Sequence, residues 1–167
     1  MGKVLMIIAP RNFRDEELFH TKEELEAAGN SVTIASTTTD TATGMLGGTA
    51  KPDMTINDVN VDDYDAVVFV GGTGSSIYFN DSKAHEIART ANEKGKIIGA
   101  ICIAPSTLAN AGLLSEKKAT SYPSEESNLR SKGANYTGNP VEKDGNIITA
   151  DGPSSAREFG RTIARSL

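Results

Sequence analysis

The sequence predicts an α/β fold with a mostly parallel, doubly wound sheet covered by helices on both faces. Short apolar runs alternate along the chain with longer amphipathic segments, and this β-α-β-α order is typical of that class. Asp65–Val70 is almost continuously apolar, as expected of a strand in a sheet buried on both faces. Hydrophobic residues make up 38% of the 167 residues, enough for one buried core, so we expect a single domain over residues 1–167.

The expected strands are short runs rich in apolar residues. In chain order they are Lys3–Ala9, Ser31–Ala35, Met54–Ile56, Asp65–Val70, Ile97–Ile101 and Ala119–Ser121, followed by a strand at Val141 and another at Asn146–Thr149. Asp144-Gly145 is a tight-turn signal, so we expect the last two strands to pair as a hairpin. The polar, glycine-rich stretch Thr37–Thr49 predicts a loop or a small hairpin.

Five longer segments carry the pattern of helices. In the first of them Leu18, Phe19 and Leu25 are spaced along one face. A glycine directly follows each of the first four segments and predicts where the helix ends. The expected helices are Asp15–Ala28, Ser82–Lys94, Ala104–Ala111, Glu125–Lys132 and Ser154–Ser166.

Composition and charge argue against several kinds of partner. The net charge is −5, whereas a protein that binds a nucleic-acid backbone needs a basic face. The apolar run at the start of the chain is too short to span a membrane and is better explained as a first strand. One cysteine cannot form an internal disulfide, which fits a reducing compartment. We therefore expect a cytoplasmic protein with no nucleic-acid and no membrane partner.

Cys102, the only cysteine, stands where the strand Ile97–Ile101 ends and a helix is expected to begin. Pro105 suits the first turn of that helix, because its missing N–H needs no partner there. A sulfur at such a turn lies near unpaired N–H groups, which together with the helix dipole stabilise the reactive thiolate. The alternative is a buried, inert thiol, since free cysteine often only packs in a core.

Two other features follow strands of the same predicted sheet. They are Gly71-Gly72 and the Pro10–Glu17 loop. In a flavodoxin-like strand order the strands before them lie beside the strand before Cys102, so the three features converge where ligands bind in such folds. The N–H of Gly72 and that of Ile103 would then form an oxyanion hole. A plain tight turn is the alternative explanation of Gly71-Gly72.

Glu17 and His20 are candidate site residues on the first helix. If Glu17 points into the pocket, burial keeps its proton in place and lets it donate a hydrogen bond to the thiolate. Otherwise it belongs to a solvated first turn. His20 lies three residues later, on roughly the same face. No His/Cys/Asp cluster has metal-ligand spacing and Gly72-Thr73-Gly74 is not a dinucleotide fingerprint, so we expect no metal and no cofactor.

Five sets of residues, taken together, are specific to one superfamily. They are Lys3–Leu5 with Phe13–Leu18, Tyr64–Gly72, Ile98–Pro105, Leu108–Leu114, and Ala119–Pro123. Through them the chain resembles the ThiJ/PfpI superfamily, which includes the parkinsonism-associated deglycase, the archaeal PfpI intracellular proteases and isonitrile hydratases. The match runs over nearly the whole length and is nearest to the PfpI-like branch.

The resemblance implies a flavodoxin-like sandwich of the class I glutamine amidotransferase type, with Cys102 as the nucleophile at a sharp elbow. By family position, Glu17 is the carboxylic acid that hydrogen-bonds the sulfur. Gly72 and Ile103 would supply the backbone N–H groups, and Tyr122 falls close to the pocket. Members of the superfamily are usually dimers, and PfpI relatives build larger rings, so the resemblance also implies a homodimer or a higher oligomer.

Two positions depart from the family pattern. PfpI proteases and glyoxalase-type members follow the cysteine with a histidine, their general base, whereas this chain has Ile103, which cannot take a proton. The deglycase-like branch carries a small residue there, so loss of the histidine is not loss of the site. Asp151 falls in the pocket region where relatives often have an arginine, and this reversed charge implies a different substrate or oligomer contact.

These observations predict a slow hydrolase or lyase of glyoxalase or deglycase type, with a cysteine nucleophile and a role in stress protection. Cys102 would attack a small carbonyl compound, such as methylglyoxal, or a glycated adduct, while Glu17 moves a proton. Peptide hydrolysis is less favoured, because its leaving amine needs a protonating acid. Two alternatives stay open. One is a redox sensor or chaperone-like protein whose Cys102 oxidises to sulfinic acid, and the other is a pseudo-enzyme with a structural cysteine.

Overall fold

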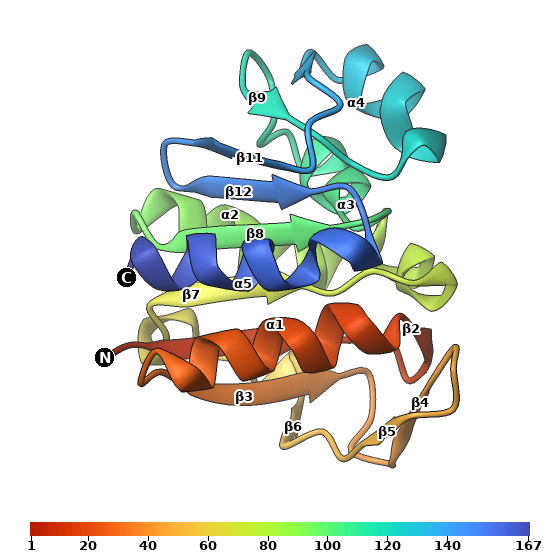
Figure 1. The fold of residues 1–167 in the computed structure, drawn as a ribbon, viewed down its shortest axis with the longest axis vertical. Helices are drawn as coiled ribbons and strands as arrows, with labels where there is room; N and C mark the ends of the chain where they lie inside the picture. Colours follow the sequence, from red (N-terminus) through yellow and green to blue (C-terminus); the bar gives the residue numbers. More distant parts are fainter.

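Seven strands form one twisted sheet at the centre of the protein (Figure 1). The computed structural model describes residues 1–167 and orders these strands β11-β12-β8-β7-β1-β3-β6. They are β1 (Lys3–Ile7), β3 (Ser31–Ser36), β6 (Met54–Thr55), β7 (Ala66–Phe69), β8 (Ile97–Ile101), β11 (Val141–Asp144) and β12 (Ile147–Ala150). All neighbours pair in parallel except β11 and β12, which form the expected hairpin. The predicted mostly parallel α/β architecture is confirmed.

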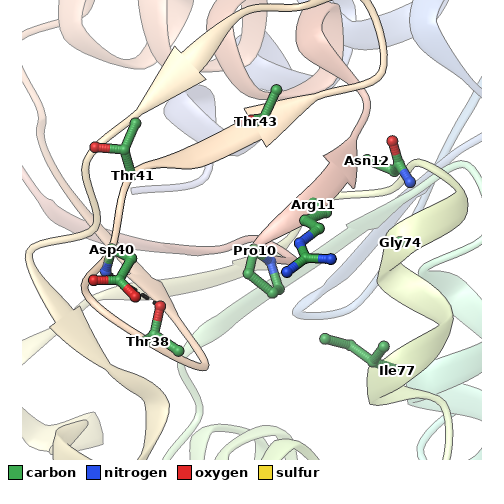
Figure 2. Close-up of a pocket in the computed structure, with 9 residues that line it drawn as sticks. All are labelled: Pro10, Arg11, Asn12, Thr38, Asp40, Thr41, Thr43, Gly74 and Ile77. Atoms are coloured by element: carbon green, nitrogen blue, oxygen red, sulfur yellow. Dashed lines mark hydrogen bonds between the residues drawn. The ribbon is translucent and has the colours of Figure 1, made fainter.

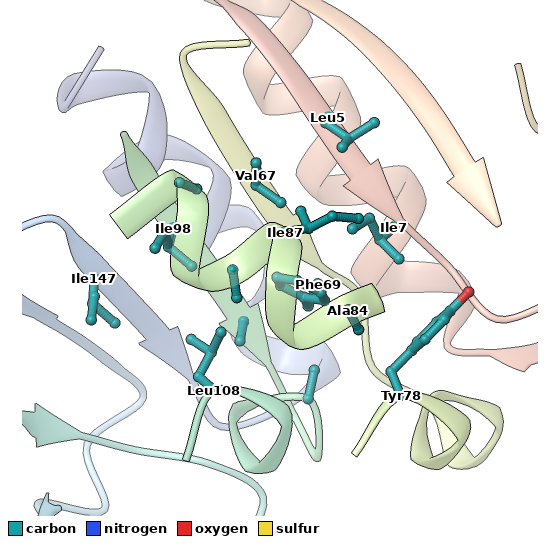
Figure 3. Packing of buried hydrophobic residues seen from close by; sticks show 14 of the residues in the cluster. Leu5, Ile7, Val67, Phe69, Tyr78, Ala84, Ile87, Ile98, Leu108 and Ile147 are labelled. Atoms are coloured by element: carbon teal, nitrogen blue, oxygen red, sulfur yellow. The ribbon is translucent and has the colours of Figure 1, made fainter. Parts of the chain in front are cut away.

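Helices cover both faces of the sheet, and the alternation of side chains along β1 shows how. Leu5 and Ile7 face α2 (Ser82–Glu93) and α3 (Pro105–Asn110), whereas Val4 and Met6 face α1 (Asp15–Ala27) and α5 (Ala156–Arg165). Figure 3 shows the first of these layers, in which Ile87 of α2 and Leu108 of α3 pack over the strands. Each strand thus buries both faces, which explains its continuous apolar sequence.

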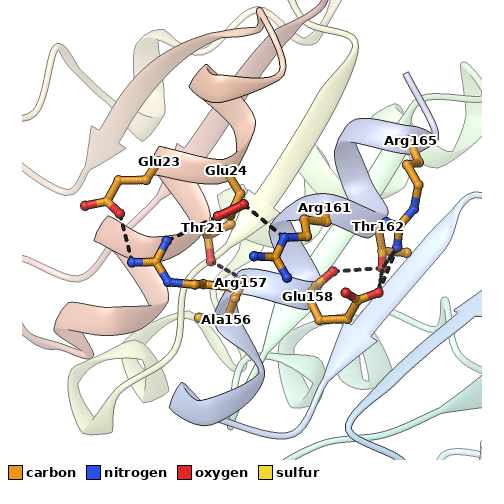
Figure 4. Close-up of polar contacts among 9 residues, drawn as sticks. All are labelled: Thr21, Glu23, Glu24, Ala156, Arg157, Glu158, Arg161, Thr162 and Arg165. Atoms are coloured by element: carbon orange, nitrogen blue, oxygen red, sulfur yellow. Dashed lines mark hydrogen bonds and ion pairs between the residues drawn. The ribbon is translucent and has the colours of Figure 1, made fainter.

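Helices α1 and α5 pack against each other as well as against the sheet. Gly160 allows this close approach, because a Cβ there would lie 2.9 Å from the carbonyl oxygen of Thr21. On the outer surface Arg157 pairs with Glu23 at 3.0 Å and with Glu24 at 3.2 Å (Figure 4). Arg161 also pairs with Glu24, at 3.0 Å. The position of α1, which carries the candidate Glu17, is therefore fixed by α5 as well as by the strands beneath it.

Two small ladders flank the main sheet. β2 (Arg11–Phe13) pairs with β4 (Ala42–Gly44), which pairs with β5 (Thr49–Ala50) as the hairpin that the Thr37–Thr49 stretch predicts. β9 (Lys118–Ala119) pairs with β10 (Asn135–Tyr136) outside the main sheet. The sequence pattern misses β2 and β10, because segments of two or three residues are too short to show a period of two. No helix has the length and apolarity needed to cross a membrane.

The last two helices begin later than the sequence predicts. A turn of 3-10 helix at Pro123–Glu125 precedes α4 (Glu126–Ser131), and another at Pro153–Ser155 precedes α5. Both turns start with proline, whose fixed φ suits a first helical position and whose ring supplies no N–H to continue a hydrogen-bond ladder. These two turns lie next to the candidate site described below.

We predict that the buried packing between α5 and the sheet stabilises the fold far more than the ion pairs on its surface. Phe159 is fully buried, so Phe159→Ala should lower the free energy of unfolding by about 3–5 kcal/mol. Arg157→Ala, which removes two partly exposed ion pairs, should lower it far less, because solvent and salt screen exposed charges. Urea denaturation of the two variants provides the comparison, and equal losses would contradict this account.

Candidate active site

The three strands that precede the candidate residues are neighbours in the sheet, in the order β8-β7-β1. Their carboxyl ends therefore lie at one edge, and the loops that follow them meet there. The backbone N–H of Arg14, in the loop after β1, donates to the carbonyl of Gly71, after β7, at 3.0 Å. Helix α1 begins at the next residue, so this hydrogen bond places its first turn, with Glu17, beside the loop after β7. The expected convergence of the three features is present.

Cys102 occupies a strained turn between β8 and α3. Its φ is +65°, in the left-handed region that a non-glycine residue seldom adopts. Two backbone hydrogen bonds hold it there: its N–H donates to Ala150 at 2.9 Å, and its carbonyl accepts from the N–H of Tyr122 at 2.8 Å. The residue is 8% exposed, so little of Cys102 reaches solvent.

The backbone N–H groups of Gly72 and Ile103 lie near the sulfur of Cys102 and act to lower the pKa of its thiol. Gly72 has a φ of +100°, and a Cβ at this position would overlap the backbone nitrogen of Arg14. Glycine is thus needed here for both its conformation and its size, a requirement that a plain tight turn and an oxyanion hole share.

Glu17 is completely buried in the first turn of α1. Neither of its carboxyl oxygens has a full hydrogen-bond partner in the protein, and the groups that interact with it are the thiol of Cys102 and the N–H of Gly71. A Cβ at Gly71 would overlap Oε1 of Glu17, so the second glycine of the pair makes room for the carboxyl. Burial raises the pKa of Glu17 to about 8, and it therefore carries a proton at neutral pH.

Burial also raises the pKa of the Cys102 thiol, to about 12, with a further contribution from the negative charge of Glu17. The N–H groups of Gly72 and Ile103 act in the opposite direction but do not outweigh burial. The expectation that N–H groups and a helix dipole suffice to stabilise the thiolate is therefore wrong. Because Glu17 is neutral below about pH 8, the thiolate is most stable when Glu17 keeps the proton and donates it to the sulfur. The two groups act as one titrating pair.

Cys102 lies in a pocket of about 240 Å³ built from six separate parts of the chain. The lining residues are Arg14, Met45, Gly72, Thr73, Cys102, Ile103, Tyr122, Ser124 and Pro153. Sequence analysis identifies Tyr122 among them but misses Met45 and Ser124. Met45 reaches the pocket because Asp15, at the start of α1, accepts hydrogen bonds from the N–H groups of Leu46 and Gly48, both at 2.8 Å. Asp15 and the turn that contains Leu46 and Gly48 lie about thirty residues apart in the chain. Their hydrogen bonds can therefore be seen only in the folded structure.

The structure does not bring His20 and Asp151 into this pocket. His20 lines a neighbouring hollow together with Glu16, Ser154 and Arg157. Pro153 is the only residue that lines both this hollow and the Cys102 pocket. Asp151 accepts a hydrogen bond from the hydroxyl of Ser155 at 2.6 Å, which stabilises the turn before α5. No histidine lies beside the sulfur, so Glu17 is the titratable side chain closest to the chemistry.

The largest hollow in the protein is a different one. It has a volume of about 690 Å³ and lies between the loops that follow β1, β3 and β7 (Figure 2). Arg11 and Asp40 are its charged residues, threonines supply much of its lining, and Cys102 is not part of it. Nowhere does the structure gather three or more His, Cys, Asp or Glu side chains in a metal-binding arrangement. The only cysteine therefore lies in the smaller pocket and not in this one.

Comparison with known proteins agrees with this geometry. Residues 2–166 match the model of the DJ-1/PfpI family. The chain belongs to that family. An uncharacterized protein of Methanocaldococcus jannaschii is 46% identical over 99% of this chain and 82% of its own length. A protein of Pyrococcus horikoshii named a deglycase is 33% identical over 99% of each chain.

A solved structure supports the same assignment. The crystal structure of a ThiJ/PfpI domain protein from Brachyspira murdochii is 34% identical, with a TM-score of 0.96 over 99% of this chain and 97% of its own. The resemblance seen in the sequence is therefore confirmed at the level of family and fold. The name of the Pyrococcus relative suggests an activity but does not assign it to this chain.

We predict that the buried carboxyl of Glu17 destabilises the protein as the pH rises. Its ordinary pKa is 4.5 and its folded pKa is about 8, so between these values only the unfolded chain releases the proton. Glu17→Gln removes this titration, and its stability relative to wild type should increase by a few kcal/mol between pH 5 and pH 8. Urea denaturation at several pH values measures the difference.

Glu16→Gln is the matched control. The hydrogen bond from Arg14 lowers the pKa of Glu16, so Glu16 stabilises the protein once it is ionised and its replacement should not reproduce the rising difference. A difference between Glu17→Gln and wild type that stays constant with pH would contradict the placement of Glu17 as a buried, protonated acid.

Proposed function

We propose that this DJ-1/PfpI protein is a slow glyoxalase- or deglycase-type enzyme that uses Cys102 as its nucleophile. One observation carries the proposal: a strained cysteine, Gly72 and Ile103 line one small pocket, and the protonated carboxyl of Glu17 is buried beside the cysteine. Each supplies a part that carbonyl chemistry requires, namely a nucleophile, stabilisation of an oxyanion and a proton carrier. The deglycase name of the Pyrococcus horikoshii relative supports the same class.

The first step is addition of the thiol across a carbonyl group. The sulfur of Cys102 forms a bond to the carbonyl carbon, the C=O π bond breaks, and its electron pair moves to the oxygen. The N–H groups of Gly72 and Ile103 stabilise that oxygen, and the proton leaving the thiol reaches it through Glu17. The product is a hemithioacetal, and no atom is gained or lost in the step.

With a 2-oxoaldehyde such as methylglyoxal, the remaining steps need one more proton carrier, for which Glu17 is the available group. One proton moves from the former aldehyde carbon to the adjacent carbon, and the hydroxyl proton moves to the oxygen on that adjacent carbon. Together these transfers convert the hemithioacetal into a thioester that carries a 2-hydroxy group. Water then hydrolyses the thioester to a 2-hydroxy acid and restores Cys102. The pocket of about 240 Å³ favours small substrates over a folded polypeptide.

Ile103 limits the rate of this chemistry. Its side chain lines the pocket directly beside the nucleophile, where no proton can be accepted. A positioned general base typically contributes ~10²–10⁴-fold to a rate, so turnover is expected to be slow. Proteolysis is the less favoured activity, because the leaving amine of a peptide must also be protonated.

A redox role of Cys102 is the second candidate. The same polar groups that would hold an oxyanion could accommodate the oxygens of a sulfinic acid, since Gly72 and Ile103 offer N–H donors and protonated Glu17 offers an O–H. Oxidation by two equivalents of hydrogen peroxide, which is reduced to water, would add two oxygen atoms to the sulfur. A mass shift of two oxygens at Cys102 under mild peroxide treatment tests it, and an inert thiol would rule it out.

We predict that Cys102→Ser abolishes consumption of methylglyoxal and formation of the 2-hydroxy acid. Serine keeps the size of the side chain but is a much weaker nucleophile in a site without an adjacent base. Arg157→Ala, which lies outside the pocket, is the control that should keep wild-type turnover. Wild-type turnover in Cys102→Ser would refute the proposed function.

We also predict that Ile103→His increases turnover. The new imidazole would stand directly after the nucleophile and supply the missing base, with an expected gain of at least about ten-fold in kcat near pH 7. Ile103→Asn, which adds polarity without a base, should show no such gain. Comparable rates in the two variants would mean that the absent base does not limit the reaction.

A further inference from the structure

One wall of the Cys102 pocket is the segment Tyr122–Ser124, whose three residues are all exposed at the surface. Tyr122 and Ser124 line the pocket from this segment, and the side chain of Tyr122 is 47% exposed. The segment is attached to the nucleophile by the hydrogen bond from the N–H of Tyr122 to the carbonyl of Cys102, at 2.8 Å. One backbone hydrogen bond does not by itself define where two side chains stand.

Glu125 provides the second attachment. Its Oε2 accepts from the hydroxyl of Ser124 at 2.8 Å, and its Oε1 accepts from the hydroxyl of Ser106 at 2.7 Å. Ser106 is fully buried in the first turn of α3, four residues after Cys102. The backbone N–H of Glu125 also donates to the carbonyl of Tyr122 at 2.9 Å. One carboxylate therefore joins the helix that follows the nucleophile to the wall that faces it.

The buried end of this contact is itself held in place. Asn128 donates from Nδ2 to the hydroxyl of Ser106 and to Oδ1 of Asn110, both at 3.0 Å. The Ser106 hydroxyl thus accepts one hydrogen bond and donates another, and its proton would be left without this acceptor if Glu125 were removed. Buried hydroxyl groups that lose a partner are unfavourable, so the arrangement strongly favours the present position of Glu125.

We propose that Glu125 is a positioning residue that sets the width of the Cys102 pocket and thereby selects small carbonyl substrates. Glu125 is not among the residues that line the pocket, so it acts through Tyr122 and Ser124 and not by contact with substrate. The inference rests on the proposed function in treating this pocket as the substrate site. The inference goes beyond the proposed function because it names Glu125 as the group that limits the size of the substrate.

The test compares Glu125→Ala and Glu125→Gln with Glu126→Ala. Glu126 is the adjacent acidic residue, is partly exposed, and pairs only with Arg130, so it is a matched control for charge and location. The first readout is the ratio of alkylation rates of Cys102, the only cysteine, by iodoacetamide and by the bulkier N-phenylmaleimide. The second is KM against kcat for methylglyoxal.

In Glu125→Ala the wall should loosen and the preference for the small reagent should fall about five-fold, the factor that corresponds to the net loss of one hydrogen bond. KM should rise with kcat nearly unchanged. Glu125→Gln should restore most of the preference, because its amide oxygen can accept from Ser106 while its nitrogen donates to the hydroxyl of Ser124. Glu126→Ala should match wild type in both readouts.

Unchanged ratios and an unchanged KM in Glu125→Ala would overturn the proposal. If that variant does not fold, Ser124→Ala removes only the exposed half of the contact and should show a smaller fall in the same ratio, whereas an unchanged ratio would again overturn it. Wild-type protein that alkylates but does not turn over methylglyoxal would refute the proposed function alone. The alkylation ratio would still decide the role of Glu125.

Discussion

The structure depends on one unfavourable contact, the burial of a carboxyl group against a thiol. Glu17 has no full hydrogen-bond partner and Cys102 is almost inaccessible, so neither group ionises readily by itself. Placing them together lets the carboxyl hold a proton close to the sulfur, and the sulfur becomes reactive when the pair loses one proton. Two further requirements follow from this contact: a glycine where a Cβ would strike the carboxyl, and a backbone turn that presents the sulfur to it.

The rest of the fold holds Glu17 and Cys102 together although their contact is unfavourable and the backbone of Cys102 is strained. Helix α1 is held from two sides, by its packing on α5 and by the hydrogen bond from Arg14 to Gly71. Cys102 is held through its own N–H and carbonyl by Ala150 and Tyr122. Strained residues persist only where the surroundings determine them, and the parallel strands on either side of β8 meet that condition here.

The pocket around Glu17 and Cys102 is formed by short segments that belong to different parts of the fold. Asp15 brings the turn with Met45 to one side, and Glu125 joins the Tyr122 segment to the other. Both acidic residues act through hydrogen bonds to backbone or hydroxyl groups and not through ion pairs. The walls of the pocket and the buried pair are therefore positioned by different contacts, so a change in a wall need not disturb the pair.

The sequence by itself determined the fold class and the main strands, and for a flavodoxin-like strand order it predicted that the segments carrying Cys102, Gly72 and Glu17 meet. It left open whether Glu17 points inward or to solvent, and the structure shows Glu17 completely buried. Buried parallel strands require continuous apolar runs, and the carboxyl ends of neighbouring strands must share one edge. Only the tertiary structure decided the protonation of the pair, because desolvation depends on everything packed around a group. It also placed His20 and Asp151 outside the pocket and Met45 inside it. Those positions depend on contacts between segments far apart in the chain, and no local spacing of residue types records them.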